Sequence, residues 1–130
     1  MSDGNNQLVG NGSATAAIPA FVIVAQDTAT DGGVIVANGT NGKYLGVGPE
    51  YAIASGAQIP YTFGGEAQVT VGAGGVTHGD FLTSDTNGFA ITATLVQNNT
   101  AGSNTPLIGI ARKTGAANDI VPIQVLPGVA

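Results

Sequence analysis

The chain has 130 residues, which fits a single domain, and only 8% of them are charged, against about 25% in an ordinary soluble domain. Its formal net charge of −5, from eight acidic and three basic residues, excludes a surface that neutralises a row of phosphates, so we expect no nucleic-acid partner. With no cysteine in the chain, disulfides, thiolate chemistry and cysteine-ligated zinc are excluded as well.

The first 17 residues differ in composition from the rest of the chain. Asn, Gly, Ser and Ala dominate residues 1–17, and Leu8 and Val9 are the sizeable apolar anchors within them. We predict a flexible N-terminal arm over 1–17 and a single β domain over 18–130. Leu8 and Val9 become candidate contacts with a partner, although a disordered tail without function fits the composition too. Such an arm contributes little to folding, so its deletion is expected to leave the melting temperature nearly unchanged.

The next segment is apolar on both of its faces. Residues 18–25 carry no polar side chain, and only Pro19 departs from a strand-like composition, which is typical of a strand buried on both sides or of a strand that enters a subunit interface. The second alternative makes Ile18 and Phe21 candidate partner contacts. The uninterrupted apolar run over 16–25 is far shorter than the roughly 20 residues that span a bilayer, so we expect no membrane partner. No secretory signal precedes it, which predicts synthesis in a cytoplasm.

The remaining sequence predicts an all-β fold. There are 37 β-branched residues (14 Thr, 13 Val, 10 Ile), and 21 Gly and 6 Pro interrupt any helical pattern. Apolar residues alternate with period two in four windows, and dipeptides that favour tight turns separate several of them. The windows are residues 59–63, 67–71, 89–95 and 121–125, and the turn signals lie at 31–33, 38–39, 41–42 and 87–88. We predict a small β-barrel or β-sandwich of about eight to ten short strands.

Two parts of the chain resemble one another in sequence. Residues 31–36, 44–47 and 55–63 resemble residues 86–91, 107–110 and 117–125, at offsets of about 55 and then 62 or 63. This pattern predicts an internal duplication with Pro60 and Pro122 in matching places, since neither can donate to a strand ladder. Chance alternation in a sequence rich in Val and Gly is the alternative.

Several motifs resemble the capsid decoration, or head cement, proteins of tailed bacteriophages. They are Gly79-Asp80-Phe81-Leu82-Thr83-Ser84-Asp85, Asn87-Gly88-Phe89-Ala90, Leu107-Ile108-Gly109-Ile110-Ala111 and the apolar ending over residues 121–128, preceded by Leu45-Gly46-Val47 and residues 64–72. The resemblance covers most of residues 33–128. It implies a structural protein on the capsid exterior of a virion, which binds the major capsid protein, clamps neighbouring capsid subunits and forms a homotrimer.

Residues for catalysis or for a cofactor are scarce. His78 is the single histidine, no Gly-x-Ser-x-Gly elbow accompanies it, and we therefore predict neither an enzyme nor a cofactor. Asp27 and Asp31 fit turns better than a calcium loop, because Ala29 and Asn38 stand where oxygen-rich ligands are needed. A carbohydrate- or receptor-binding β module on a virion or tail is the alternative function, with only seven aromatic residues (four Phe, three Tyr) to form sugar platforms.

Overall fold

The computed structural model describes residues 8–39, 44–93 and 106–129, and these residues form nine β-strands. No helix long and apolar enough to cross a membrane occurs among them. The nine strands confirm the prediction of an all-β fold with eight to ten short strands. The strands are β1 (Leu8–Ala14), β2 (Ile23–Gln26), β3 (Gly33–Val36), β4 (Tyr44–Val47), β5 (Gln58–Thr70), β6 (Phe81–Ser84), β7 (Ala90–Thr92), β8 (Pro106–Ala111) and β9 (Ile120–Val129).

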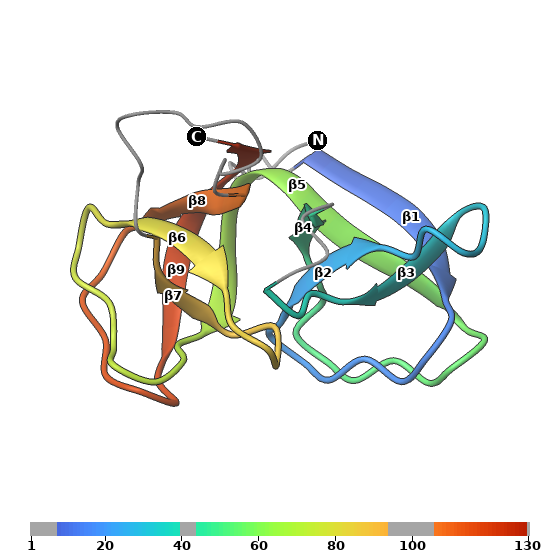
Figure 1. Ribbon diagram of the computed structural model, residues 1–130, viewed down its shortest axis with the longest axis horizontal. Helices are drawn as coiled ribbons and strands as arrows, with labels where there is room; N and C mark the ends of the chain where they lie inside the picture. The colour runs from blue at the N-terminus through green and yellow to red at the C-terminus, as the bar shows by residue number, and fades with distance from the viewer. Residues whose placement is uncertain (1–7, 40–43, 94–105, 130) are drawn as a thin grey trace, which may run out of the picture.

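The first five strands close into a barrel, which we call the N-terminal barrel. Its strand order is β1-β3-β2-β4-β5, and β1 pairs with both β3 and β5, so that the sheet has no free edge there. The pairing of β1 with β3 is parallel and the pairing with β5 is antiparallel. Figure 1 shows this barrel beside a second group of strands, with β5 running between the two.

The second group, which we call the C-terminal lobe, repeats the topology of the barrel. Its order is β5-β9-β8-β6-β7, and an isolated parallel bridge between Val71 and Ala90 links the end of β5 to β7. The counterpart in the N-terminal barrel is the parallel pairing of Ala14 with Val34, which links β1 to β3. Each half of the chain thus folds into the same arrangement, and β5 belongs to both halves.

The two prolines singled out in the sequence occupy corresponding registers. Pro60 on β5 lies opposite Asn11 of β1, and Pro122 on β9 lies opposite Gln68 of β5. In each half, the strand that contains the proline therefore pairs with the first strand of that half, which is β1 in the N-terminal barrel and β5 in the C-terminal lobe. An origin of the two halves by duplication stays a prediction from the sequence.

A glycine pair marks the point where β5 passes from one half to the other. Residues 58–64 pair with β1, whereas residues 65–70 pair with β9. Gly65 has φ of 85°, a backbone conformation that residues with a Cβ rarely adopt. Leu8 lies against Gly64, because a Cβ added there would come 2.9 Å from the Leu8 Cδ1 atom. Glycine at both positions lets one continuous strand serve two sheets.

Two apolar clusters form the core. One consists of Ala14, Ile18, Val22, Val24, Val34, Ile53 and Ile59, all from the N-terminal half. The other joins Ile23, Ala25, Ala37 and Val47 of that half to eleven buried residues of the C-terminal lobe. Because β2 contributes to both clusters, it is buried on both faces, as its apolar sequence predicts. Main-chain bonds reinforce this contact, including Ile23 N–H to Gly88 O at 2.8 Å.

The expected boundary at residue 17 differs from the structure. Residues 8–14 form β1 and pair with β5 over six positions, so they are part of the barrel and not a free arm. Apart from Leu8 and Val9, these residues are small (Gly, Asn, Ser and Ala) and give no strand signal, and their contribution to the barrel is mainly through main-chain hydrogen bonds. Residues 1–7 of the expected arm, and the turn expected at 41–42, lie outside the described residues.

Candidate binding groove

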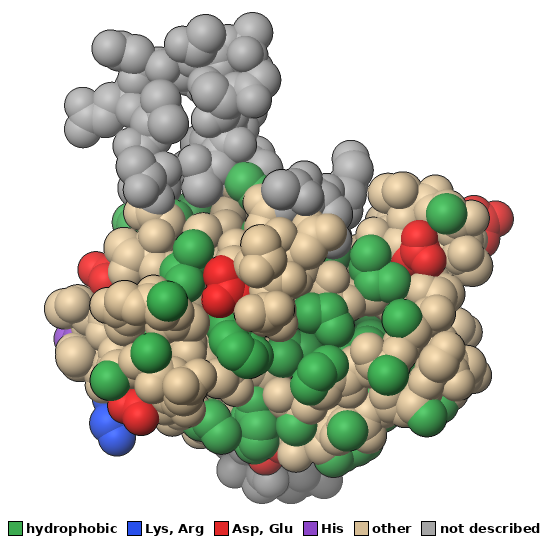
Figure 2. All heavy atoms as spheres, turned by 60° about the horizontal axis from the view of Figure 1, so that its bottom comes forward, with side chains coloured by type: hydrophobic (Ala, Val, Ile, Leu, Met, Phe, Trp, Pro, Cys, Tyr) green, Lys and Arg blue, Asp and Glu red, His purple; other side chains and the backbone are tan. Residues whose placement is uncertain are grey.

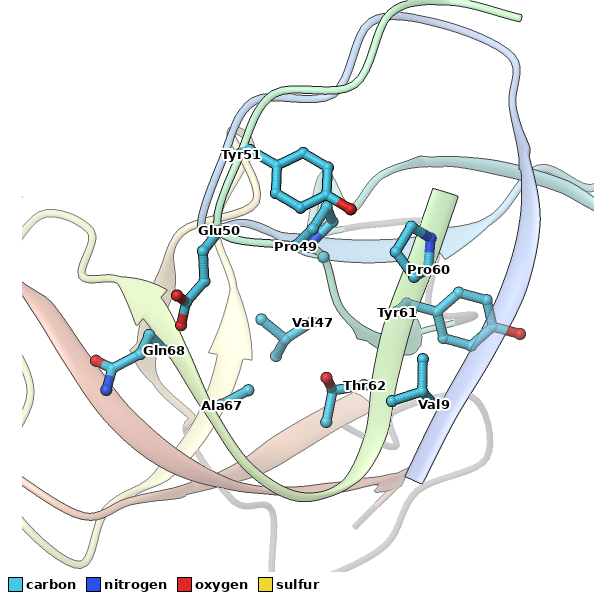
Figure 3. A pocket seen from close by; sticks show the side chains of 11 residues that line it. Val9, Val47, Pro49, Glu50, Tyr51, Pro60, Tyr61, Thr62, Ala67 and Gln68 are labelled. Atoms are coloured by element: carbon cyan, nitrogen blue, oxygen red, sulfur yellow. The ribbon is translucent and has the colours of Figure 1, made fainter. Parts of the chain in front are cut away.

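A groove of about 410 Å³ lies at the junction of β1, β4 and β5. The chain segment that follows β4 forms one of its walls, and both halves of β5 contribute residues to it (Figure 3). The lining residues are Val9, Val47, Gly48, Pro49, Glu50, Tyr51, Pro60, Tyr61, Thr62, Ala67 and Gln68. We call this the junction groove.

The junction groove has an apolar floor. Val47 and Ala67 are buried, and Figure 3 shows them between the two sides, with Thr62 beside them. Their positions follow from the strand pattern, because Val47 ends β4 opposite Thr62 of β5. Alternate residues of β5 point to opposite faces of the sheet, so Ala67 turns inward where its neighbours face outward.

Polar and aromatic side chains rise around that floor. Tyr51 lies near Pro49 and Pro60 on one side, whereas Glu50 and Gln68 are neighbours on the other (Figure 3). Tyr51 is 58% exposed. Among the described residues, no hydrogen bond or ion pair engages the side chains of Glu50, Tyr51 or Gln68. The groove therefore presents one aromatic ring, one carboxylate and one amide that are free to bind a ligand.

The four candidate contacts from the sequence lie in different environments. Leu8 and Val9 are 57% and 52% exposed at the start of β1, and Val9 lines the junction groove. Ile18 is 1% exposed inside the N-terminal barrel, so the prediction that it contacts a partner is wrong. An apolar run cannot distinguish a core strand from an interface, and here Ile18 pairs with Ile53 in the interior. Phe21 is half-buried with φ of 60°.

A second apolar hollow of about 440 Å³ is formed by residues of β4, β5 and β9. Tyr44, Leu45, Tyr61, Phe63 and Pro127 line it. The rings of Tyr61 and Phe63 lie 6.4 Å apart at an angle of 56°. Further exposed apolar side chains elsewhere on the described surface are those of Phe81, Ile120 and Leu126. Figure 2 shows how few charged side chains separate the hydrophobic ones on one face.

Neither His78 nor Ser84, the one buried polar residue of the described chain, is placed for catalysis. Ser84 is 3% exposed, and its hydroxyl donates a hydrogen bond to the main-chain oxygen of Asp85 at 2.8 Å. His78 is exposed in a turn, where its main-chain N–H donates to the Thr114 hydroxyl at 3.0 Å. The part of the chain that the structure describes holds no group of three or more His, Cys, Asp or Glu placed to bind a metal ion.

Asp27, considered above for a calcium loop, organises a turn. Its Oδ1 accepts the Ala29 N–H at 3.0 Å and its Oδ2 accepts the Thr15 hydroxyl at 2.8 Å. The Thr15 hydrogen bond, together with that of Ala29, lowers the pKa of the Asp27 carboxyl from its ordinary value of 3.8. In the C-terminal lobe Asp85 makes the corresponding bond, with the Asn87 N–H at 2.8 Å. The default interpretation of Asp27 as a turn residue is therefore supported by its contacts.

No family model and no curated protein matches this chain. Among solved structures, it is similar to the N base of the head fiber protein gp8.5 of bacteriophage phi29. The TM-score is 0.65 and the identity is 17%, and the match covers 92% of this chain and 93% of the other. The two chains share their fold along nearly their entire length.

Proposed function

We propose that the chain is a structural virion protein that binds the outer surface of a tailed-phage capsid. The observation that carries this proposal is the fold, which matches the base of a phage head fiber over 92% of the chain. The sequence motifs that resemble capsid decoration proteins support it independently of the fold. A protein with this role needs a stable scaffold and a contact surface, and it needs no catalytic group.

The proposed partner is the major capsid protein, and the proposed action is to clamp neighbouring capsid subunits. Leu8 and Val9 support this, because β1 presents two exposed apolar side chains in succession. Full burial of each would contribute about 1.5 to 3 kcal/mol to binding, before the cost of ordering the contact is subtracted. Because the chain has only three basic and eight acidic residues, burial of apolar side chains is the main source of the binding free energy to the capsid.

Attachment is tested by sedimentation of the purified chain with expanded phage capsids from its source lysate, and in parallel with host cells. We expect the chain to pellet with capsids, and to appear on their outer surface in electron micrographs. The double variant Leu8→Ala, Val9→Ala should bind less, whereas Phe81→Ala, which also removes an exposed apolar side chain, should bind normally. Sedimentation with host cells alone would contradict the proposal and favour a receptor-binding module.

We further propose that the chain assembles as a homotrimer. Its low charge and its exposed apolar side chains favour covering part of the surface with copies of itself. Light scattering after size exclusion should give about three times the 12.7 kDa of one chain. A mass of 12.7 kDa at about 50 µM, well above the dissociation constants of stable oligomers, would contradict a trimer that forms off the capsid.

A further inference from the structure

We propose that the junction groove binds a neutral saccharide, with the Tyr51 ring against one face of the sugar and with Glu50 and Gln68 bonded to its hydroxyl groups. This inference does not depend on attachment to a capsid. It concerns a surface formed by the β4–β5 junction, whereas the proposed capsid contacts are centred on Leu8 and Val9. Only Val9 is common to both.

The aromatic side of the groove suits the apolar face of a sugar ring. Tyr51 is 58% exposed and belongs to neither of the two core clusters. Pro49 and Pro60 flank it (Figure 3), and because each proline ring fixes φ, the backbone around the aromatic platform has little freedom to lose when a ligand binds. A sugar C–H face stacked there would remove apolar surface of both partners from water.

The opposite side of the groove suits hydroxyl groups. The Glu50 carboxylate only accepts hydrogen bonds at neutral pH, whereas the Gln68 amide both donates and accepts them. These two side chains lie next to one another in Figure 3. Neighbouring hydroxyls of a pyranose can each donate and accept, so this pair of groups can bind both of them in a cooperative arrangement.

Charge selects among saccharides. Glu50 is the single charged residue of the groove lining, and the whole chain carries a net charge of −5. A carboxylate or phosphate on a ligand would be repelled by Glu50 and would find no basic partner in the lining. Neutral hexoses and N-acetylhexosamines meet no such penalty.

The size and the surroundings of the groove favour a small glycan over a peptide strand. Its volume of about 410 Å³ lies in the range of small-molecule sites. A peptide that binds by strand addition needs an unpaired strand edge. At the groove, β5 already pairs with β1 on one side and with β4 at Thr62 on the other. The occupant must therefore be recognised by the side chains.

The experiment is a screen of the full chain on a glycan array that carries neutral hexose and N-acetylhexosamine oligosaccharides, with sialylated and phosphorylated ones as charge controls. The neutral glycan that binds best is then titrated into isotope-labelled protein and followed by NMR. We expect amide shifts concentrated at Val47, Thr62 and Ala67. Tyr51→Ala should weaken binding about tenfold, the loss of one aromatic contact.

Matched variants distinguish the groove from other surfaces. Phe81→Ala removes an exposed aromatic side chain on β6, outside the groove, and should leave glycan affinity unchanged. Gln68→Ala should weaken binding, and an unchanged melting temperature would show that each variant is folded. No neutral glycan bound at millimolar concentration, preference for acidic glycans, or equal affinity of Tyr51→Ala would each overturn the proposal. So would dissociation of an oligomer by Tyr51→Ala, which would assign the groove to a second copy of the chain.

Discussion

At the scale of single residues, two glycines set how closely the strands approach. A Cβ at Gly46 of β4 would overlap the carbonyl oxygen of Thr62, and a Cβ at Gly109 of β8 would overlap that of Gln124. The neighbouring atom in both cases belongs to the main chain of a paired strand, which cannot rotate away as a side chain can. Both halves of the fold therefore require glycine at this point for the same steric reason.

Gly46→Ala should lower the free energy of unfolding by about 3 kcal/mol, because β4 has to move away from β5. The control is Gly56→Ala, at a turn where φ is 89° and where no atom lies within 4 Å of the added Cβ. That variant suffers backbone strain alone, about 1 kcal/mol. Urea unfolding followed by circular dichroism measures both, and equal losses would contradict the steric argument.

Asp27 gives a prediction that depends on pH. Its lowered pKa means that the carboxylate form is favoured in the folded state. The associated stability is present above the unfolded pKa, about 3.8, and is lost as the pH falls through the lower folded value. Thr15→Val removes the hydroxyl that is the main cause, so the pKa of Asp27 should rise toward 3.8.

An NMR titration of the Asp27 carboxyl carbon measures this change directly. Thr28→Val is the matched control, because Thr28 is exposed in the same turn and its hydroxyl is not a partner of Asp27. If Thr15→Val and the unaltered chain titrate alike, the hydrogen bond from the Thr15 hydroxyl is not what lowers the pKa.

At the scale of elements, β1 contributes to the fold through its main chain. It pairs with β5 over six positions and with β3 at Ser13 and Ala14, while Leu8 and Val9 stay exposed. Without β1, the edges of β3 and β5 would be unpaired and Ala14 would no longer cover the barrel interior. The N-terminal barrel needs this strand for closure.

Deletion of residues 1–17 should therefore abolish the cooperative thermal transition, contrary to what composition alone predicts. The control is Leu8→Ala with Val9→Ala, which keeps the main-chain pairing and removes only exposed side-chain atoms. That double variant should melt close to the unaltered chain. A truncated protein that melts normally would restore the interpretation of residues 1–17 as a dispensable arm.

The strands with alternating apolar residues were the most predictable elements. Val121, Ile123 and Val125 are buried as their period-two pattern predicts, because a half-buried strand requires that alternation. At β7 the same pattern predicts that Ile91 faces the core and Ala90 faces outward, but Ala90 is buried whereas Ile91 is only half-buried. A short strand between two turns gives too few residues to fix which face is inward.

The junction groove could not be predicted from the sequence. Glu50 and Tyr51 follow β4, whereas Gln68 lies in the second half of β5, and closure of the barrel brings them together. Glu50 and Tyr51 belong to no motif, and Gln68 lies in the strand segment over 64–72, whose pattern of apolar residues and glycines predicts a strand and not a binding site. Their one signal is the presence of Tyr51 next to an acidic residue in a chain with only three tyrosines, which is not specific enough to indicate a site.

At the scale of the whole molecule, the low charge has consequences for binding. Three basic and eight acidic residues leave little for salt to screen, so attachment to a capsid should change little between about 50 and 500 mM salt. Cosedimentation across that range measures it, with a strongly basic protein that binds the same capsids as a positive control for screening. Loss of most of the bound chain would show that charge supplies the attachment energy.

The shared strand β5 also determines how the molecule unfolds. Its thirteen residues complete both halves, so unfolding of either half removes the partner strand of the other. An isolated half would keep a long unpaired edge and part of the second apolar cluster open to water. We therefore expect the two halves to unfold as one cooperative unit, with a single heat-absorption peak in calorimetry, and we expect cleavage within β5 by a protease to unfold both halves at once.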